Sequence, residues 1–405
     1  MHNKFKNPSD TIIINATNIG RKFQGIGVYS FNIINELTRL KSKLNFIIYL
    51  NKSCRECFSD IKFPENFELR WVTSLISPDF NFKGHLLRLL YSNYLSLRFR
   101  KFHIFNTSQM EINFFRSRQI VTVHDIIPLL FRKYHRKQYF FFKLLLNYGL
   151  KKANYIITPS NHSKKLLKEI YALPENRIKV IHNGADSSYA GSDEPVEDLP
   201  DKFILYLGRI NKMKNIGSLL KAYYKIMDSI EHKLVIIGND KNAFYMELNS
   251  AKCDFPDDRI IFLENITTTR KNFILTKASL FVFPSLYEGF GLPPIEAMAK
   301  GCPVIVSNNS SLTEVCGDAA IYIDPENVDE IASKIIDVLN NGDLLEQMSQ
   351  AGISRSKFFK WYFSGIVHLN TIESVVTYNQ LPVDENILEI FSLMGNHREI
   401  ISNAN

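Results

Sequence analysis

Two cations in the second half of the chain have the type and spacing that binding a phosphate requires. Arg209 and Lys214 stand in the segment GRINKMKN (208–215), directly after an apolar run typical of a strand and before a helix-like pattern. The free N–H groups and the positive dipole at the start of such a helix favour an anion, and the two side chains would add their charges. Position alone indicates a pair of solvated surface cations equally well.

Two glutamates follow in the segment EGFGLPPIEAMAKGCPVIVS (288–307). Gly289 and Gly291 allow backbone conformations closed to other residues and let a ligand approach the main chain closely. The proline pair after them predicts a helix over 294–300, which places Glu296 in its first turn, where the dipole suits a carboxylate. Taken singly, Glu296 is explained as a helix-start carboxylate and Glu288 as a solvated loop charge.

The first half of the chain carries weaker signals. The segment GRKFQGIGVY (20–29) places Gly25 and Gly27 between a strand and a helix, but position 30 is Ser, so the dinucleotide fingerprint G-x-G-x-x-G is not met. We therefore predict no NAD site. His124 and Asp125 end an apolar strand in VTVHDIIP. A lone histidine in such a place is more often a structural residue than a catalyst.

Alternating strands and helices must position these residues. A strand at 11–15, a glycine loop, a helix over 28–40 and a strand at 45–50 form a βαβ unit, the building block of a doubly wound parallel sheet. Three further strand-like runs follow in the first half, at 120–125, 155–160 and 178–184.

The pattern breaks around 184–202 into the Gly, Ser, Asp, Glu and Pro composition of a linker and then restarts. Strands in FILYLG, KLVIIG, IIFLE, LFVFPS and PVIVS alternate with helices near 216–227, 243–253, 272–277 and 294–300. We therefore predict an α/β fold with two doubly wound parallel-sheet domains and a cleft between them. The loops after FILYLG, KLVIIG and LFVFPS should face that cleft, because ligands bind at the carboxyl ends of parallel strands.

Composition excludes several classes of protein. The chain has 405 residues, of which 45% are hydrophobic and 22% charged, as expected for two soluble globular domains. Five scattered cysteines predict a reducing, cytoplasmic setting. Cys54 and Cys57 lack the second ligand pair that a zinc site needs, so we predict that they are two unpaired thiols. No apolar run reaches the roughly 18 to 20 residues that span a bilayer.

The net charge of +8 is divided unevenly between the halves. Residues 1–185 contain 30 basic and 11 acidic side chains, whereas residues 186–405 contain 19 and 30. The basic half therefore predicts an anionic partner, nucleic acid or a membrane surface. No helix-turn-helix or RNA-binding motif accompanies it, so we predict no nucleic acid. Cations alternate with large apolar residues in 83–102 and 131–152, which fits helices resting on anionic lipid; core helices with cationic outer faces are the alternative.

As a set, EGFGLPPIEAMAKGCPVIVS, GRINKMKN, HDIIP and GIGVY, in their order and spacing, resemble the retaining, nucleotide-sugar-dependent glycosyltransferases of family 4. The resemblance runs from about residue 12 to residue 336 and is most specific in the C-terminal segment. It implies the GT-B fold, with two Rossmann-like domains facing a central cleft. The corresponding domains are a basic, acceptor-binding domain at 1–190, a linker at 191–200, a donor-binding domain at 201–355, a C-terminal helix at 356–380 that crosses back to the first domain, and a tail at 381–405.

The resemblance also implies roles for the charged residues. Arg209 and Lys214 correspond to the basic pair that binds the donor diphosphate and stabilises the leaving group in place of a metal. Lys212, in the same segment, could share the role of Lys214. Glu296 corresponds to the glutamate that accepts hydrogen bonds from the nucleotide ribose, and Glu288 to the group that holds the donor sugar hydroxyls.

Main-chain and N-terminal positions complete the implied site. The backbone of Gly289, Phe290 and Gly291 would hold the donor sugar together with Glu288. His124 corresponds to a histidine that reaches the donor sugar from across the cleft. Gly25 and Gly27 correspond to a glycine loop that lets the first helix approach the donor phosphate and the acceptor.

The resemblance implies retention of configuration without a protein nucleophile: the acceptor hydroxyl attacks as the diphosphate leaves, and a phosphate oxygen takes the proton. We expect no cofactor and no metal, GDP-mannose or a UDP-sugar as donor, and a saccharide acceptor, lipid-linked, as in bacterial surface polysaccharide (O-antigen or capsule) assembly. The expected location is cytoplasmic, on the inner face of the membrane. A nucleotide-sugar epimerase of the same fold, a nucleic-acid-binding protein and a non-catalytic scaffold are the alternatives.

Overall fold

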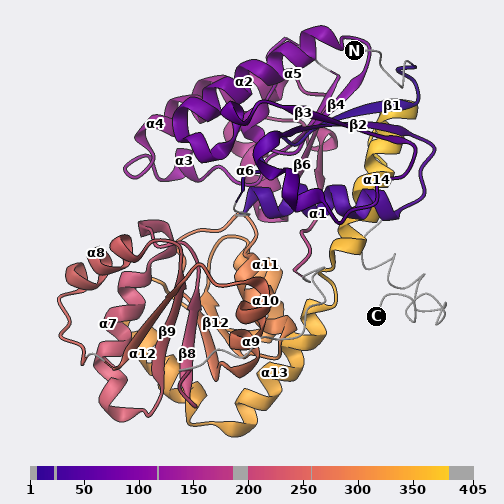
Figure 1. The fold of residues 1–405 in the computed structure, drawn as a ribbon. Coiled ribbons are helices and arrows are strands. Elements are labelled where there is room, and N and C mark those ends of the chain that lie inside the picture. Colours follow the sequence, from indigo (N-terminus) through magenta and orange to yellow (C-terminus); the bar gives the residue numbers. More distant parts are fainter. Residues whose placement is uncertain (1–6, 22–24, 116–117, 186–198, 257, 383–405) are drawn as a thin grey trace.

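The computed structural model describes residues 7–21, 25–115, 118–185, 199–256 and 258–382. It contains the two parallel α/β sheets that the sequence predicts (Figure 1). The first sheet lies within residues 11–180 and the second within residues 203–323. The prediction of free thiols is also confirmed, since all five cysteines are unpaired.

The first sheet has seven parallel strands in the order β3-β2-β1-β4-β5-β6-β7. Ile13 at its centre is in register with Ile47 and Ile104 and is completely buried. The strands are β1 (Thr11–Asn15), β2 (Asn45–Asn51), β3 (Phe67–Val72), β4 (His103–Asn106), β5 (Gln119–Thr122), β6 (Tyr155–Thr158) and β7 (Ile178–Val180).

Helices cover both faces of this sheet. Apolar residues of α1 and α14 pack on one face, and those of α2 pack on the other. The helices before the linker are α1 (Ile26–Arg39), α2 (Asn81–Arg98), α3 (Ile127–Leu130), α4 (Arg136–Phe140), α5 (Asn147–Lys152) and α6 (Asn161–Tyr171). A π-helical segment, Phe141–Leu146, joins α4 to α5.

The second sheet has six parallel strands in the order β10-β9-β8-β11-β12-β13. They are β8 (Phe203–Leu207), β9 (Lys233–Gly238), β10 (Ile260–Glu264), β11 (Leu280–Phe283), β12 (Val304–Ser307) and β13 (Ala320–Ile323). The helices around it are α7 (Ile216–Ile226), α8 (Lys241–Ala251), α9 (Thr268–Lys277), α10 (Leu292–Ala299), α11 (Leu312–Cys316), α12 (Val328–Leu339) and α13 (Gly342–Ser356).

The last helix, α14 (Trp361–Tyr378), leaves the second domain and runs along α1 of the first (Figure 1). Gly365 makes this close packing possible, since a Cβ there would lie 2.5 Å from the Cβ of Glu36. The hydroxyl of Ser42 also donates to the carboxylate of Glu373 at 2.6 Å. Thus α14 is part of the core of the first domain.

Candidate functional site

The candidate site lies where the strand order of each sheet reverses. In the second sheet β8 and β11 are neighbours, while the chain proceeds from β8 towards one edge and from β11 towards the other. Ligands of open parallel sheets bind at such switch points, beyond the carboxyl ends of the strands. Arg209 and Lys214 follow β8 and Glu288 follows β11, so the fold brings these three predicted residues together.

Lys214 and Glu288 form an ion pair between Lys214 Nζ and Glu288 Oε1. The two side chains are only 19% and 9% exposed, and the ammonium also lies 5.4 Å from the centre of the Phe283 ring. Asn211 orders the loop by accepting hydrogen bonds from the N–H groups of Met213 and Lys214. Glu288 is therefore a buried partner of a cation and not the solvated loop charge that it suggests when taken singly.

Arg209 is the solvent-exposed cation of the site. Its side chain is exposed, although protein atoms crowd around it, and this desolvation lowers the pKa of its guanidinium while Asp125 raises it. Lys212, by contrast, turns away and pairs with Glu247 of α8 at 2.8 Å. Of the two lysines in this loop, Lys214 alone contacts Glu288, so Lys212 does not share its place.

His124 enters from the first domain, just beyond β5. Its Nε2 lies 2.9 Å from the carbonyl oxygen of Thr107, which can only accept, so Nε2 carries the proton. Burial lowers the pKa of His124 to about 4, and the ring is therefore neutral at physiological pH. Among the described residues nothing bonds Nδ1, which leaves a neutral acceptor for a ligand hydroxyl.

Asp125 has no role in the sequence-based prediction, but the structure places it among the charges of the second domain. Burial raises the pKa of its carboxyl group, nearby Glu288 raises it further, and Lys214 lowers it. The signal in the sequence was its place directly after a strand end, next to His124. The site thus combines two carboxylates and two cations drawn from both domains.

The loop 289–291 presents N–H groups rather than carbonyls. Ser311 donates to the carbonyls of Glu288 and Phe290 at 3.0 and 2.9 Å, and Ser160 donates to that of Gly289 at 2.8 Å. Within the described part of the chain, the N–H groups of residues 289, 290 and 291 have no acceptor. Gly291, with φ of +100°, directs this loop into α10, so three free donors lie at a positive helix end.

Gly289 allows a close contact between the two domains, whereas the sequence analysis predicts that it lets a ligand approach the main chain. A Cβ at this position would lie 2.2 Å from the carbonyl oxygen of His124 and 3.0 Å from the Cβ of Asp125. The missing side chain thus makes room for the backbone of the first domain. The carboxylate of Glu314 strengthens the same contact, since it accepts from the N–H groups of Asn161 and His162 at 2.9 and 3.1 Å.

The prediction for the helix after this loop was wrong in one respect. Helix α10 begins at Leu292, two residues before the predicted start, so Glu296 is its fifth residue and lies outside the first turn. Proline is tolerated at the first helical positions because their N–H groups have no partner within the helix. Glu296 instead pairs with Lys271 of α9 at 2.8 Å, a residue that the sequence analysis missed.

Gly25 and Gly27 lie at the start of α1. Gly25 is its N-cap residue with φ of +45° and is exposed, and no atom of the described residues lies within 4 Å of where its Cβ would be; Gly27 is buried. Residues 22–24 of this loop lie outside the described residues. The next turn of α1 reaches the site, because the ring of Tyr29 lies edge-on to that of His124 with centroids 4.6 Å apart.

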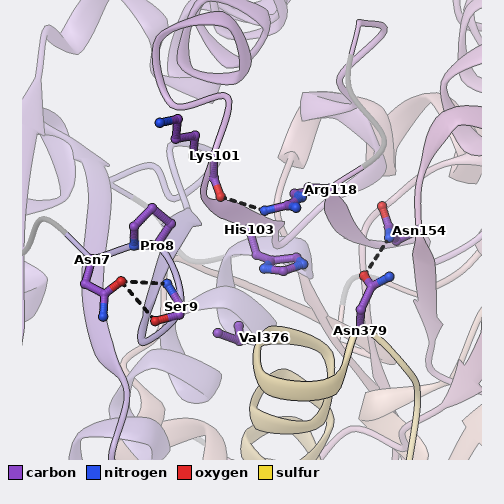
Figure 2. Close-up of a pocket in the computed structure, with 9 residues that line it drawn as sticks. All are labelled: Asn7, Pro8, Ser9, Lys101, His103, Arg118, Asn154, Val376 and Asn379. Carbon is purple, nitrogen blue, oxygen red and sulfur yellow. Dashed lines mark hydrogen bonds between the residues drawn. The ribbon is translucent and has the colours of Figure 1, made fainter.

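A cavity of the first domain lies away from this site. A hollow of about 630 Å³ is found at the amino ends of strands of the first sheet, between Ser9, His103, Arg118, Asn154 and Asn379 (Figure 2). None of the predicted site residues lines it. We place the site at the carboxyl ends, because the charged residues converge there and parallel sheets bind ligands there.

No group of three or more His, Cys, Asp or Glu side chains in the described residues could hold a metal ion. Likewise, no helix within the described ranges is long and apolar enough to cross a membrane.

Comparison with protein families gives two matches that together span most of the chain. Residues 23–189 match the model for glycosyltransferase family 4, and residues 192–355 match that for glycosyl transferases group 1. The division between them falls in the linker region.

Three curated relatives are similar in sequence. The O-antigen chain mannosyltransferase B of Escherichia coli is 29% identical over 282 residues, covering 66% of this chain and 73% of the relative. The O-antigen chain mannosyltransferase RfbU of Salmonella typhimurium is 28% identical over 325 residues, covering 78% and 87%. An N-acetylgalactosaminyltransferase of Campylobacter jejuni, named for an undecaprenol-diphosphate-linked substrate, is 26% identical over 227 residues, covering 54% and 59%.

Solved structures share the fold at low sequence identity. Sucrose-phosphate synthase of Thermosynechococcus elongatus superimposes with a TM-score of 0.67 at 17% identity, covering 88% of this chain and 96% of that one. WaaG, a glycosyltransferase of lipopolysaccharide biosynthesis, gives 0.65 at 13% identity, covering 91% and 100%. The predicted GT-B architecture is confirmed.

Proposed function

The chain belongs to the glycosyltransferases of family 4, and we propose that it moves a sugar, with retention of configuration, from a nucleotide-diphosphate sugar to a saccharide acceptor. One observation carries the proposal. Arg209, Lys214 and the free N–H groups of residues 289–291 converge at the switch point of the second sheet. A diphosphate is the ligand whose charge and oxygen atoms fit two cations and a row of backbone donors.

These groups would supply catalysis by stabilising the leaving group. As the bond between the anomeric carbon and the phosphate oxygen breaks, its electron pair passes to the diphosphate, whose new charge Arg209 and Lys214 neutralise without a metal ion. The acceptor hydroxyl attacks the same face and gives its proton to that phosphate oxygen. Fixed charges and accurate positioning replace a protein nucleophile in this scheme.

The remaining polar groups would hold the two ends of the donor. Glu288 accepts hydrogen bonds from the sugar hydroxyls, and the free Nδ1 of neutral His124 accepts another from the first domain. Glu296 accepts from the ribose hydroxyls. Lys271 orients the carboxylate of Glu296, since their ion pair spans α9 and α10.

We propose mannose as the sugar and GDP-mannose as the donor, with a lipid-linked glycan of surface polysaccharide assembly as the acceptor. The O-antigen mannosyltransferases among the relatives support the sugar and the pathway class. The relative named for an undecaprenol-linked substrate supports a lipid-linked acceptor.

A thermal-shift panel of GDP, UDP, ADP and their sugars tests the donor site. We expect GDP and GDP-mannose to raise the melting temperature, and Arg209→Ala to weaken the binding of the active nucleotide at least tenfold, since it removes a charge-assisted contact to phosphate. Lys212→Ala is the matched control, because Lys212 lies in the same loop but pairs with Glu247. Stabilisation by no nucleotide would remove the proposal; release of free nucleotide diphosphate without an acceptor would indicate an epimerase.

We also propose that one face of the first domain rests on an anionic membrane. Of 19 large hydrophobic side chains exposed among the described residues, 14 lie between Leu75 and Tyr148. Helix α2 carries one such row along its outer side, at Leu86, Leu90, Tyr94 and Leu97. Outer faces of this kind are unusual for a soluble domain and typical of interfacial helices.

A second apolar row continues this face. Phe140, Leu144 and Tyr148 are exposed at intervals of four residues, and His85 of α2 contacts Phe141 with ring centroids 5.3 Å apart, so the two rows are neighbours. Neither 80–110 nor 126–168 contains an acidic residue. The face is therefore apolar and uniformly cationic, as binding to anionic headgroups requires; each basic residue near such a surface contributes about 1 kcal/mol.

Co-sedimentation with vesicles tests this face. We expect binding to vesicles containing phosphatidylglycerol but not to neutral ones, weakening as salt is added. The double variant Leu90→Glu/Leu144→Glu should bind at least tenfold more weakly, because both exposed side chains would be replaced by anions. Met246→Glu is the control, since Met246 is 70% exposed on the second domain. Sedimentation that is indifferent to lipid charge, or lost equally in the control, would contradict the proposal.

A further inference from the structure

The C-terminal helix places a histidine beside the site in the first domain. His368 of α14 is completely buried, and its Nε2 lies 2.7 Å from the hydroxyl of Tyr29 on α1. Tyr29, 1% exposed, contacts the ring of His124 edge-on. A residue more than 240 positions from His124 in the sequence is thus one side chain away from it in space.

The directions of these hydrogen bonds follow from the acceptors. The Nδ1 of His368 lies 2.7 Å from the carbonyl oxygen of Ser364, which can only accept, so the proton is on Nδ1 and Nε2 is a bare acceptor. Tyr29 must therefore donate its hydroxyl proton to His368. The hydroxyl of Thr122, 2.8 Å away, then donates to the Tyr29 oxygen. His368, Tyr29 and Thr122 therefore each have one compatible role as donor or acceptor in this chain of bonds.

This chain of bonds joins the elements that carry the first domain's part of the site. Tyr29 stands four residues after Gly25 on α1, and Thr122 ends β5 two residues before His124. Apolar rings pack beside this chain of bonds, with Trp361 next to Tyr29 and Phe105 next to His368, at centroid distances of 6.4 and 6.2 Å. Burial also lowers the pKa of His368 to about 4, so the ring stays neutral and keeps its acceptor. Directional bonds in an apolar wall fix orientation more strictly than packing alone, because an unmade bond there is costly.

We propose that His368 is a positioning residue for the transferase site: through the hydroxyl of Tyr29 it fixes the ring of His124 and the start of α1. The inference rests on the proposed function for its kinetic consequence. The last helix is then part of the site's support and not only a tether between the domains.

Variants of the two partners test the proposal. Tyr29→Phe and His368→Leu each remove one end of the bond, and we expect kcat to fall at least tenfold while the Kd for the donor nucleotide stays within twofold. His368→Gln, whose amide oxygen can accept from Tyr29, should recover most of the activity. The double variant Tyr29→Phe/His368→Leu should be no slower than either single variant, because both break the same bond.

A control and a spectroscopic measurement separate positioning from folding. Thr371 of α14 is also completely buried, but within the described residues its hydroxyl donates only to the carbonyl of Val367 in its own helix, so Thr371→Val should lower stability without changing kcat. The ring nitrogen resonances of His124 should shift in Tyr29→Phe and His368→Leu and return in His368→Gln. Unmoved resonances, or equal loss of kcat in Thr371→Val, would overturn the proposal. The resonances can be measured without a sugar donor or an acceptor substrate, so they test the positioning of His124 even if the proposed activity is wrong.

Discussion

Replacing Lys214 by methionine is expected to lower kcat by about a thousandfold under saturating donor. Lys214 is the cation closest to Glu288, and a preorganised charge that stabilises a leaving group typically contributes a factor of 10² to 10³ or more. Methionine has an unbranched side chain of similar length, so it removes the ammonium that lies over the Phe283 ring but retains an apolar stem. Single-turnover rates of sugar transfer measure the loss directly.

The same substitution leaves the carboxylate of Glu288 without its partner. Glu288 is 7% exposed, and breaking one side of such a buried pair costs roughly 3 kcal/mol of folding free energy. A second variant, Lys214→Met/Glu288→Gln, removes both charges and should recover most of that stability while activity stays low. If the double variant were as active as the wild type, neither charge would take part in the reaction and the assignment of this pair would fail.

The sequence predicts the elements that surround the site well, because each is encoded locally. The apolar runs before Arg209 and Glu288 are buried strands, and their spacing from the next helix pattern places both residues at carboxyl ends. The start of α10 was predicted two residues too late. Pro294 is compatible with the first helical position, as predicted, but also with the third, which it takes in the structure after Pro293 at the second. Strands β3, β4 and β13 were not predicted. In β3 (FELRWV) and β4 (HIFN) charged or polar residues interrupt the apolar run, and β13 (AIYI) is partly exposed and has no strong flanking pattern.

The partners of the site residues could not be predicted in the same way. The bonds between Lys271 and Glu296, and between Tyr29 and His368, join segments 25 and 339 residues apart, and no local pattern specifies such a pair. The two exposed apolar rows of the first domain, on α2 and at residues 140–148, could not be predicted from local patterns either. Helix α2 has apolar residues on both its inner and outer sides, and periodicity alone does not tell which side is buried.

Replacing Gly289 by alanine is expected to reduce transfer at least a hundredfold while leaving nucleotide binding intact. The new Cβ would lie 2.2 Å from the carbonyl oxygen of His124, a backbone atom that cannot move aside as a flexible side chain would. The clash falls between the domains, not within either core, so each domain should still fold. The groups proposed to bind the nucleotide belong to the second domain, and alanine keeps the N–H group of residue 289. His124 of the first domain, by contrast, would be pushed away from the donor sugar, and a displacement of about 1 Å can cost a factor of 10².

Three measurements test the effect of Gly289→Ala: calorimetry with the donor nucleotide, the turnover number kcat, and the radius of gyration from solution scattering. We expect unchanged affinity, lost turnover and a larger radius for Gly289→Ala. Gly342→Ala is the matched control, because a Cβ at the start of α13 meets nothing within 4 Å. The contact of Ser160 with the carbonyl of Gly289 and that of Glu314 with the start of α6 resist the separation, so the radius shows whether they hold. A Gly289→Ala protein with normal turnover and radius would mean that the loop relaxes locally and that close contact between the domains is not required for transfer.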